Sequence, residues 1–136
     1  MPVYRWAPTK TGARRNLWIT GAVVDNFPSR VETGRVIVRT WSARATGTGA
    51  AQYIDYFEHT LLPELRTLPG FAGARLLTRP LGDLTEITAH TTWESIDAIR
   101  AFAGDDVTTA KVEPEALAML SDSDPTVVHR TVVVSG

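Results

Sequence analysis

The sequence predicts an α+β fold in which strands and helices follow the order strand, helix, strand, strand, helix, strand. Stretches rich in β-branched residues alternate with stretches of helical periodicity, and Gly and Pro clusters separate them. The two middle strand-like stretches are joined by a short turn, which indicates a hairpin. With 136 residues and no cysteine, the chain can bury one core as a single domain without disulfide bonds.

The first predicted strand and helix lie between residues 36 and 66. Residues 36–43 are β-branched and aromatic, and they place Arg39 and Trp41 on the same face of a strand. Residues 50–66 are predicted to be a helix, which Pro63 is expected to kink in its last turn. One apolar stripe defines this helix: Ile54, Phe57, Leu61 and Leu65.

The second half of the chain begins with a hairpin. Residues 71–79 and 84–93 are its two strands, and the turn between them contains Pro80. Ser95 is the predicted N-cap of a helix that Gly104 ends. The remaining elements are a short helix over 114–120, a loop over 122–125 and a final strand over 126–134.

This order is the split βαβ, or ferredoxin-like, arrangement, which packs both helices on one face of a four-stranded antiparallel sheet. The other face is left uncovered, and it includes apolar residues in either register. An apolar sheet face is an association surface. We therefore expect a homodimer in which two sheets cover each other.

Residues 1–33 are expected to form an N-terminal arm. They carry more basic than acidic residues and three prolines, and only residues 17–24 could form a strand. Their aromatic side chains are Tyr4, Trp6, Trp18 and Phe27. Because such side chains bury large apolar areas, we expect the arm to dock on the body or on a partner subunit.

Composition and motifs exclude several classes of protein. A net charge of −1 gives no field that would attract nucleic acid or a membrane surface, and no apolar run approaches the length of a membrane span. We find no targeting signal and expect a cytoplasmic protein. Phosphate-binding, dinucleotide-binding and HExxH metal motifs are absent from the sequence. Glu86 and His90 lie about 13 Å apart along their strand, too far to bind one metal ion.

From about residue 34 to its end, the sequence resembles the antibiotic biosynthesis monooxygenase-like family of dimeric α/β barrels. The segments that carry the resemblance are RVIVRTW at 35–41, YIDYF at 53–57, LPGFAG at 68–73, TWESIDAIRAFAG at 92–104 and VHRTV at 128–132. The resemblance implies a domain over residues 34–136, a homodimer with facing sheets, and a ligand cavity between sheet and helices in each subunit.

The resemblance also implies an activity. Several members of the family oxidise polycyclic aromatic substrates with dioxygen and use no flavin, haem or metal. We therefore expect a cofactor-independent monooxygenase of secondary metabolism that acts on a small aromatic or polyketide-type substrate. Cyclase or decarboxylase chemistry on the same fold, or ligand binding without catalysis, are the alternatives. Haem-degrading relatives have a helical Trp and an iron-binding His, and Phe102 and Val112 stand at the corresponding positions here.

The candidate catalytic residues are His129, His90 and Tyr56. A histidine in an apolar strand can act as a general base near neutral pH, and it would take a proton from a phenol or an activated methylene group. The alternative for His129 is a hydrogen-bonded structural role, and for His90 a position at the dimer interface. Tyr56 flanks the apolar stripe of the first helix, where its hydroxyl can face either a cavity or solvent.

The candidate substrate-binding residues are Trp93, Tyr53, Trp41, Arg39 and Phe102. Arg39 would stabilise a developing phenolate or enolate, or else pair with a carboxylate. Trp93 would stack on a flat substrate, or else anchor the corner between strand and helix as a core residue. No metal ligands are predicted.

Overall fold

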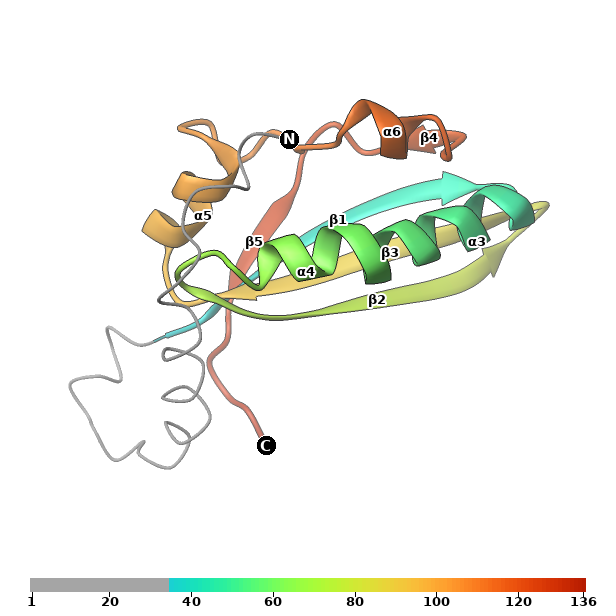
Figure 1. Ribbon diagram of the computed structural model, residues 1–136. Helices are drawn as coiled ribbons and strands as arrows, with labels where there is room; N and C mark the ends of the chain where they lie inside the picture. The colour runs from blue at the N-terminus through green and yellow to red at the C-terminus, as the bar shows by residue number, and fades with distance from the viewer. Residues whose placement is uncertain (1–34) are drawn as a thin grey trace.

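The computed structural model describes residues 35–136; the predicted arm of residues 1–33, with its strand over 17–24, lies outside this range. The described chain forms one antiparallel sheet with helices on one of its faces (Figure 1). Strand β1 (Ile37–Ala45) lies in the middle, with β3 (Leu84–Trp93) beside it and β2 (Phe71–Leu81) at the edge. On the other side, β4 (Asp122–Ser123) and β5 (Val128–Thr131) pair with different halves of β1.

A long helix runs across the sheet in three parts (Figure 1). These are α3 (Gly47–Tyr56), the π-helical turn η2 (Phe57–Leu61) and α4 (Leu62–Leu65). The other helices are α5 (Ile96–Ala103) and α6 (Pro114–Leu117). The predicted ferredoxin-like α+β fold is confirmed. No helix between residues 35 and 136 is long and apolar enough to cross a membrane.

The long helix begins earlier than predicted and buries a different stripe. It starts at Gly47, where the Thr46 side chain caps the helix by accepting a hydrogen bond from the backbone N–H of Gly49 at 3.0 Å. Ile54, predicted to be in the apolar stripe, is 40% exposed, so this part of the prediction was wrong. Tyr53 and Tyr56, predicted at the flank, are buried instead, with 3% and 6% exposure.

The π-helical turn explains this difference. Pro63 cannot donate a backbone hydrogen bond and its ring crowds the carbonyl of His59, which widens the preceding turn. The N–H of Leu62 accordingly bonds the carbonyl of Phe57, five residues back. In a regular α-helix, residues four apart drift about 40° per step around the axis. The wider turn offsets this drift, so that a stripe at four-residue spacing stays on one face: Tyr53, Phe57, Leu61 and Leu65.

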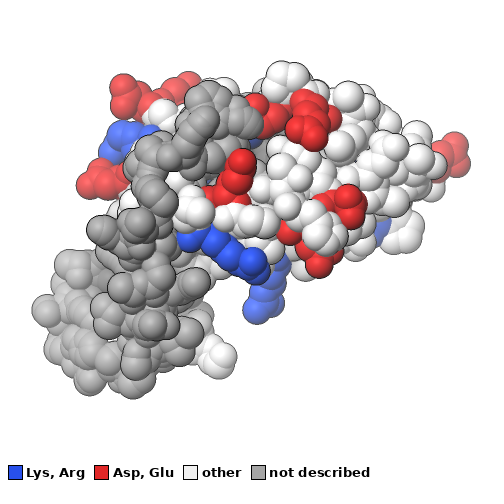
Figure 2. All heavy atoms as spheres, viewed as in Figure 1, with Lys and Arg blue, Asp and Glu red and all other residues white. Residues whose placement is uncertain are grey.

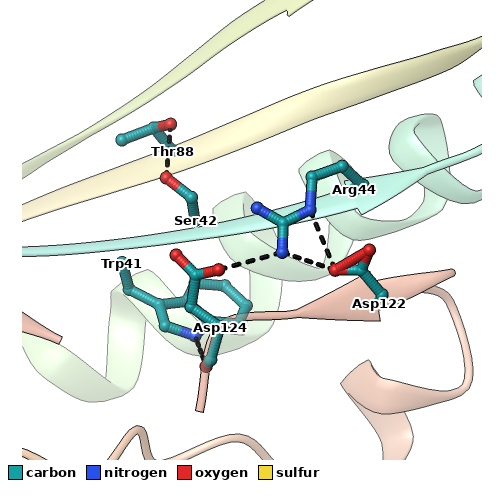
Figure 3. Close-up of polar contacts among 6 residues, drawn as sticks. All are labelled: Trp41, Ser42, Arg44, Thr88, Asp122 and Asp124. Atoms are coloured by element: carbon teal, nitrogen blue, oxygen red, sulfur yellow. Dashed lines mark hydrogen bonds and ion pairs between the residues drawn. The ribbon is translucent and has the colours of Figure 1, made fainter. Parts of the chain in front are cut away.

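The C-terminal part of the sheet differs most from the prediction. The predicted strand over 126–134 is the shorter β5, and Val133 and Val134 beyond it are exposed. The predicted loop over 122–125 contains strand β4, which Arg44 holds through ion pairs with Asp122 and Asp124 (Figure 3). Hydrophobic periodicity does not reveal such polar contacts, so it does not predict strand β4. The predicted helix over 114–120 is likewise shorter, ending at Leu117.

The other predicted boundaries agree well with the structure. Strand β3 has the predicted bounds, and β2 extends two residues further, to Leu81. The Ser95 side chain caps α5 by accepting a hydrogen bond from Ala98 N at 3.1 Å. Gly104 ends this helix with a φ of 96°, a conformation that a residue without Cβ adopts at little cost.

Two clusters of buried side chains lie between the sheet and the helices. The first cluster includes Trp41, Ala43, Tyr53, Tyr56, Phe57, Ile87, Ala89 and Ala116. The second includes Leu65, Leu68, Phe71, Trp93, Ile99, Phe102 and Ala103. In the second cluster, the ring of Trp93 stacks on that of Phe102 and meets Phe71 edge-on, with centroids 5.3 Å apart in each pair. This packing fixes the corner between β3 and α5.

The sheet face opposite the helices carries both polar and apolar side chains. Alternation and register place Thr40, Ser42, Thr88 and Thr92 on it, with a hydrogen bond of 2.8 Å between the hydroxyls of Ser42 and Thr88 (Figure 3). Its exposed large apolar side chains are Leu77, Leu81 and Val128. The open face therefore includes apolar residues, as expected, among Thr, Ser and charged side chains, and the homodimer stays a prediction.

We predict that Gly49→Ala lowers the free energy of unfolding by about 1–3 kcal/mol, since a Cβ at residue 49 clashes with the backbone carbonyl of Met119. Gly47→Ala in the first turn of the same helix is the matched control, because no atom lies within 4 Å of its added Cβ. Urea unfolding of both variants measures the difference. Equal stabilities would contradict the close approach of α3 to the residues that follow α6.

Candidate active site

A cavity lies between the sheet and the long helix, and residues 111–113 and α6 line it on a further side. Its volume is about 600 Å³, which includes its opening to solvent. Most of its wall is aromatic or aliphatic and comes from six segments of the chain. Its aromatic side chains are Trp41, Tyr53, Tyr56, Phe57 and Phe102.

Arg39 is the buried cation in this wall. It lies in the middle of β1, and only 5% of it is exposed. Its Nη1 donates hydrogen bonds to the carbonyl of Val107 at 2.7 Å and to Nε2 of His129 at 3.0 Å, and its Nη2 donates to the carbonyl of Thr109 at 3.3 Å. A guanidinium has five N–H groups, so two of them have no partner within residues 35–136.

The charge of Arg39 is also uncompensated. No carboxylate within residues 35–136 forms an ion pair with it, although the ring of Phe102 lies 5.8 Å from Cζ. Burial lowers the pKa of Arg39 to about 10, so the side chain remains a cation at neutral pH. A buried charge without a counter-ion is costly, and two free donors beside a cavity are suited to binding an anionic oxygen.

The loop before α6 is shaped to hold Arg39. The Asp106 carboxylate accepts hydrogen bonds from the hydroxyls of Thr108 and Thr109 at 2.8 and 2.7 Å, and from Thr108 N at 3.2 Å. These bonds, that of Thr109 most strongly, lower the pKa of Asp106. They fix the turn from which the carbonyls of Val107 and Thr109 reach Arg39.

Two tyrosines face the cavity from α3. The rings of Tyr53 and Tyr56 are buried with centroids 5.7 Å apart, and neither hydroxyl makes a hydrogen bond within the described range. Burial, and then the proximity of Tyr56, raises the pKa of Tyr53. Burial, followed by the negative charges of Glu115, Glu113 and Glu64, raises the pKa of Tyr56 to about 12. Both hydroxyls therefore stay protonated at neutral pH and are free to donate to a ligand.

The structure brings five of the predicted site residues to this cavity: Tyr56, Tyr53, Trp41, Arg39 and Phe102. His129 is not part of the wall but lies next to Arg39 on β5. His90 points to the opposite face of the sheet, because it alternates with Ala89 and Thr91, which line the cavity. Trp93 is fully buried in the second cluster and donates a hydrogen bond from Nε1 to Thr91 Oγ1 at 2.9 Å.

Thr91, Lys111 and Glu113 line the cavity and were not predicted as site residues. Thr91 lies directly opposite Arg39 in the pairing of β1 with β3, and only the strand register reveals this. Lys111 and Glu113 lie in a segment without regular secondary structure, and no pattern in its sequence indicated that it would line the cavity. Acidic side chains are spread over the helical face of the molecule (Figure 2). Within residues 35–136, no three His, Asp or Glu side chains are arranged to bind a metal ion.

Comparison with solved structures identifies the fold. The chain superposes on a Bacillus cereus protein assigned to the antibiotic biosynthesis monooxygenases with a TM-score of 0.51 and 16% identity, over 76% of this chain and 98% of that one. This similarity confirms the predicted resemblance at the level of the fold. No protein-family profile and no curated protein matches the sequence.

Two further structures match 76% of the chain with lower scores. One is a monooxygenase from the ActVA-Orf6 gene of Streptomyces coelicolor in complex with nanaomycin D, with a TM-score of 0.43, 22% identity and 88% of that chain covered. The other is SnoaB, a cofactor-independent oxygenase from Streptomyces nogalater, with a TM-score of 0.42, 20% identity and 95% covered.

We predict that His129 makes the stability of the protein depend on pH. Burial, and then the positive charge of Arg39, lowers the pKa of His129 below 6.5 in the folded state. As pH falls through about 6.5, the unfolded chain therefore binds a proton more readily than the folded chain, and the free energy of unfolding decreases. Above about pH 6.5, His129 does not decrease the free energy of unfolding.

Urea unfolding of the wild type and of His129→Gln between about pH 5 and 8 measures the effect, since the Gln carbonyl accepts from Arg39 at every pH. We expect a flatter pH dependence in the variant. His59→Gln on the exposed surface of the long helix is the control. Parallel curves for the wild type and His129→Gln would contradict the contact with Arg39.

Proposed function

We propose that the protein is a cofactor-independent monooxygenase that oxidises a small phenolic, polyketide-type aromatic molecule with dioxygen. The observation that carries the proposal is the buried Arg39, a cation beside an aromatic cavity, two of whose N–H groups have no partner within residues 35–136. A substrate that must become an anion before it reacts with dioxygen needs such a partner. The fold, shared with a protein assigned to the antibiotic biosynthesis monooxygenases, supports the proposal by analogy.

The reaction begins with loss of a proton from a phenol or an activated methylene group. Arg39 stabilises the resulting anion, and the proton passes to Glu113 in the cavity wall or to water at the cavity opening. The anion transfers one electron to dioxygen, and the two radicals combine at a carbon that still bears a hydrogen, which gives a peroxide anion. This anion takes back the proton and becomes a hydroperoxide. The peroxide loses water and leaves a carbonyl group. One dioxygen is consumed, one of its oxygen atoms enters the product and the other leaves as water.

His129 and His90, the predicted bases, fit this step poorly. The Nε2 lone pair of His129 already accepts a hydrogen bond from Arg39, and His90 lies on the other face of the sheet. The remaining tasks are orientation and exclusion of water. The rings of Trp41, Phe57 and Phe102 suit a flat substrate, and the hydroxyls of Tyr53 and Tyr56 can bind its outer oxygen atoms.

The proposal includes a homodimer, as the family resemblance implies, and keeps the expectation of a cytoplasmic protein. Leu77 and Val128 are exposed on the open face of the sheet, where a second copy would cover them. Sedimentation equilibrium measures the mass directly. A monomer at micromolar concentration would contradict this part of the proposal.

We predict that metal-free protein consumes one dioxygen per anthrone and releases anthraquinone and water. Arg39→Gln should reduce the rate by roughly 10²–10³-fold, because it removes the charged donor to the anion, while Arg39→Lys, which keeps the charge, should lose less. The control is Arg75→Gln, which changes an exposed arginine on the opposite sheet face. The rate of oxygen uptake is measured with an oxygen electrode, and circular dichroism verifies that each variant folds.

Other outcomes of this experiment identify the alternatives. Conversion of a polyketide-type substrate without oxygen uptake would instead indicate a cyclase or decarboxylase. Tight binding of the aromatic compound without conversion would indicate a ligand-binding protein. Either result contradicts the monooxygenase.

A further inference from the structure

One row of side chains crosses the helical face of the sheet at the cavity. Strand pairing places Ala74, Thr91, Arg39 and His129 directly opposite one another on β2, β3, β1 and β5. Directly opposite side chains in antiparallel strands have Cβ atoms about 4.5–5.5 Å apart. Thr91 and Arg39 are therefore immediate neighbours, and both line the cavity.

The hydroxyl of Thr91 has one defined partner and one free hydrogen. Trp93 Nε1 donates to Thr91 Oγ1 at 2.9 Å, so the oxygen is the acceptor in this bond. Thr91 makes no other side-chain hydrogen bond in the part of the chain that the structure describes. Its O–H group is thus a donor without an acceptor, next to the two unpaired N–H groups of Arg39.

We infer that Thr91 and Arg39 together form an oxyanion site that binds a single phenolate or enolate oxygen of the substrate. Arg39 supplies the charge and Thr91 a second donor from the neighbouring strand. Trp93 is a positioning residue, because it acts on the ligand only through Thr91. The inference that the oxygen belongs to a phenol or enol rests on the proposed function.

The surroundings hold both donors in place before a ligand arrives. Arg39 is fixed by the carbonyls of Val107 and Thr109 and by His129. Trp93 is fully buried against Phe71 and Phe102, and its indole N–H restricts the rotation of the Thr91 hydroxyl. A hydroxyl that accepts one hydrogen bond becomes a stronger donor in another. Fixed donors in a water-poor cavity favour an anionic oxygen over a neutral one.

The test uses para-nitrophenol, whose phenolate has its own visible absorption. Titrating the probe with wild-type protein at a series of pH values gives separate dissociation constants for the phenol and the phenolate. We expect tighter binding of the phenolate, and therefore a lowered pKa for the bound probe. Because both forms have nearly the same shape, a purely structural role of Thr91 would change both affinities alike.

Thr91→Val, which keeps the shape of the side chain, should weaken phenolate binding roughly tenfold to hundredfold and change phenol binding much less. Thr91→Ser should restore the preference, and Trp93→Phe should lose part of it. Thr88→Val is the matched control, since it removes a hydroxyl from the same strand on the opposite face. Melting temperatures of all variants verify folding.

An unchanged phenolate preference in Thr91→Val, or no such preference in the wild type, would overturn the inference. Oxygen uptake with anthrone is measured separately, so that the two proposals can fail independently. If uptake persists and depends on Arg39 but Thr91 has no effect on phenolate binding, only the oxyanion pair is wrong. If the phenolate preference depends on Thr91 but no oxygen is consumed, the monooxygenase is wrong and the pair stands.

Discussion

The burial of Arg39 is the constraint on which this site depends. A guanidinium inside the protein must be supported by hydrogen bonds, and two parts of the chain supply them: the carbonyls of Val107 and Thr109, and the imidazole of His129. The ring of Phe102 adds a cation–π contact. The loop over 106–109 is shaped by Asp106 for this purpose. The same contacts that stabilise the cation therefore also determine where the loop before α6 runs.

The long helix completes the chamber from the other side. Pro63 widens the turn before it, and the π-helical turn keeps Tyr53, Phe57 and Leu61 on the face that looks toward the sheet. The buried hydroxyls that result have no protein partner within residues 35–136. The polar groups of the cavity wall thus lie on β1 and β3, on α3, and in the segment before α6 that holds Lys111 and Glu113.

Local patterns predict the elements well where a turn or cap bounds them. Strand β3 and the N-cap at Ser95 follow directly from alternation and capping chemistry. The apolar stripe of the long helix was misassigned at Ile54. The predicted stripe, which starts at Ile54, and the observed stripe, which starts at Tyr53, share all their later residues, and only the π-helical turn distinguishes them. Arg39 and the tyrosines were predictable as chemistry-bearing residues on one strand and one helix. Thr91 was not, because its position beside Arg39 depends on a register that no local pattern determines.

Ala89 and Ala116 also line the cavity, and their methyl groups leave the space that a larger side chain would fill. They lie on β3 and α6, and their side chains carry no hydrogen-bond donor. The size of the ligand that the cavity accepts is therefore determined by residues other than those that bind the charged oxygen of the ligand. Exchanging one alanine for a bulkier or more polar residue would therefore change which molecules fit the cavity while the charged and hydrogen-bonding groups are retained.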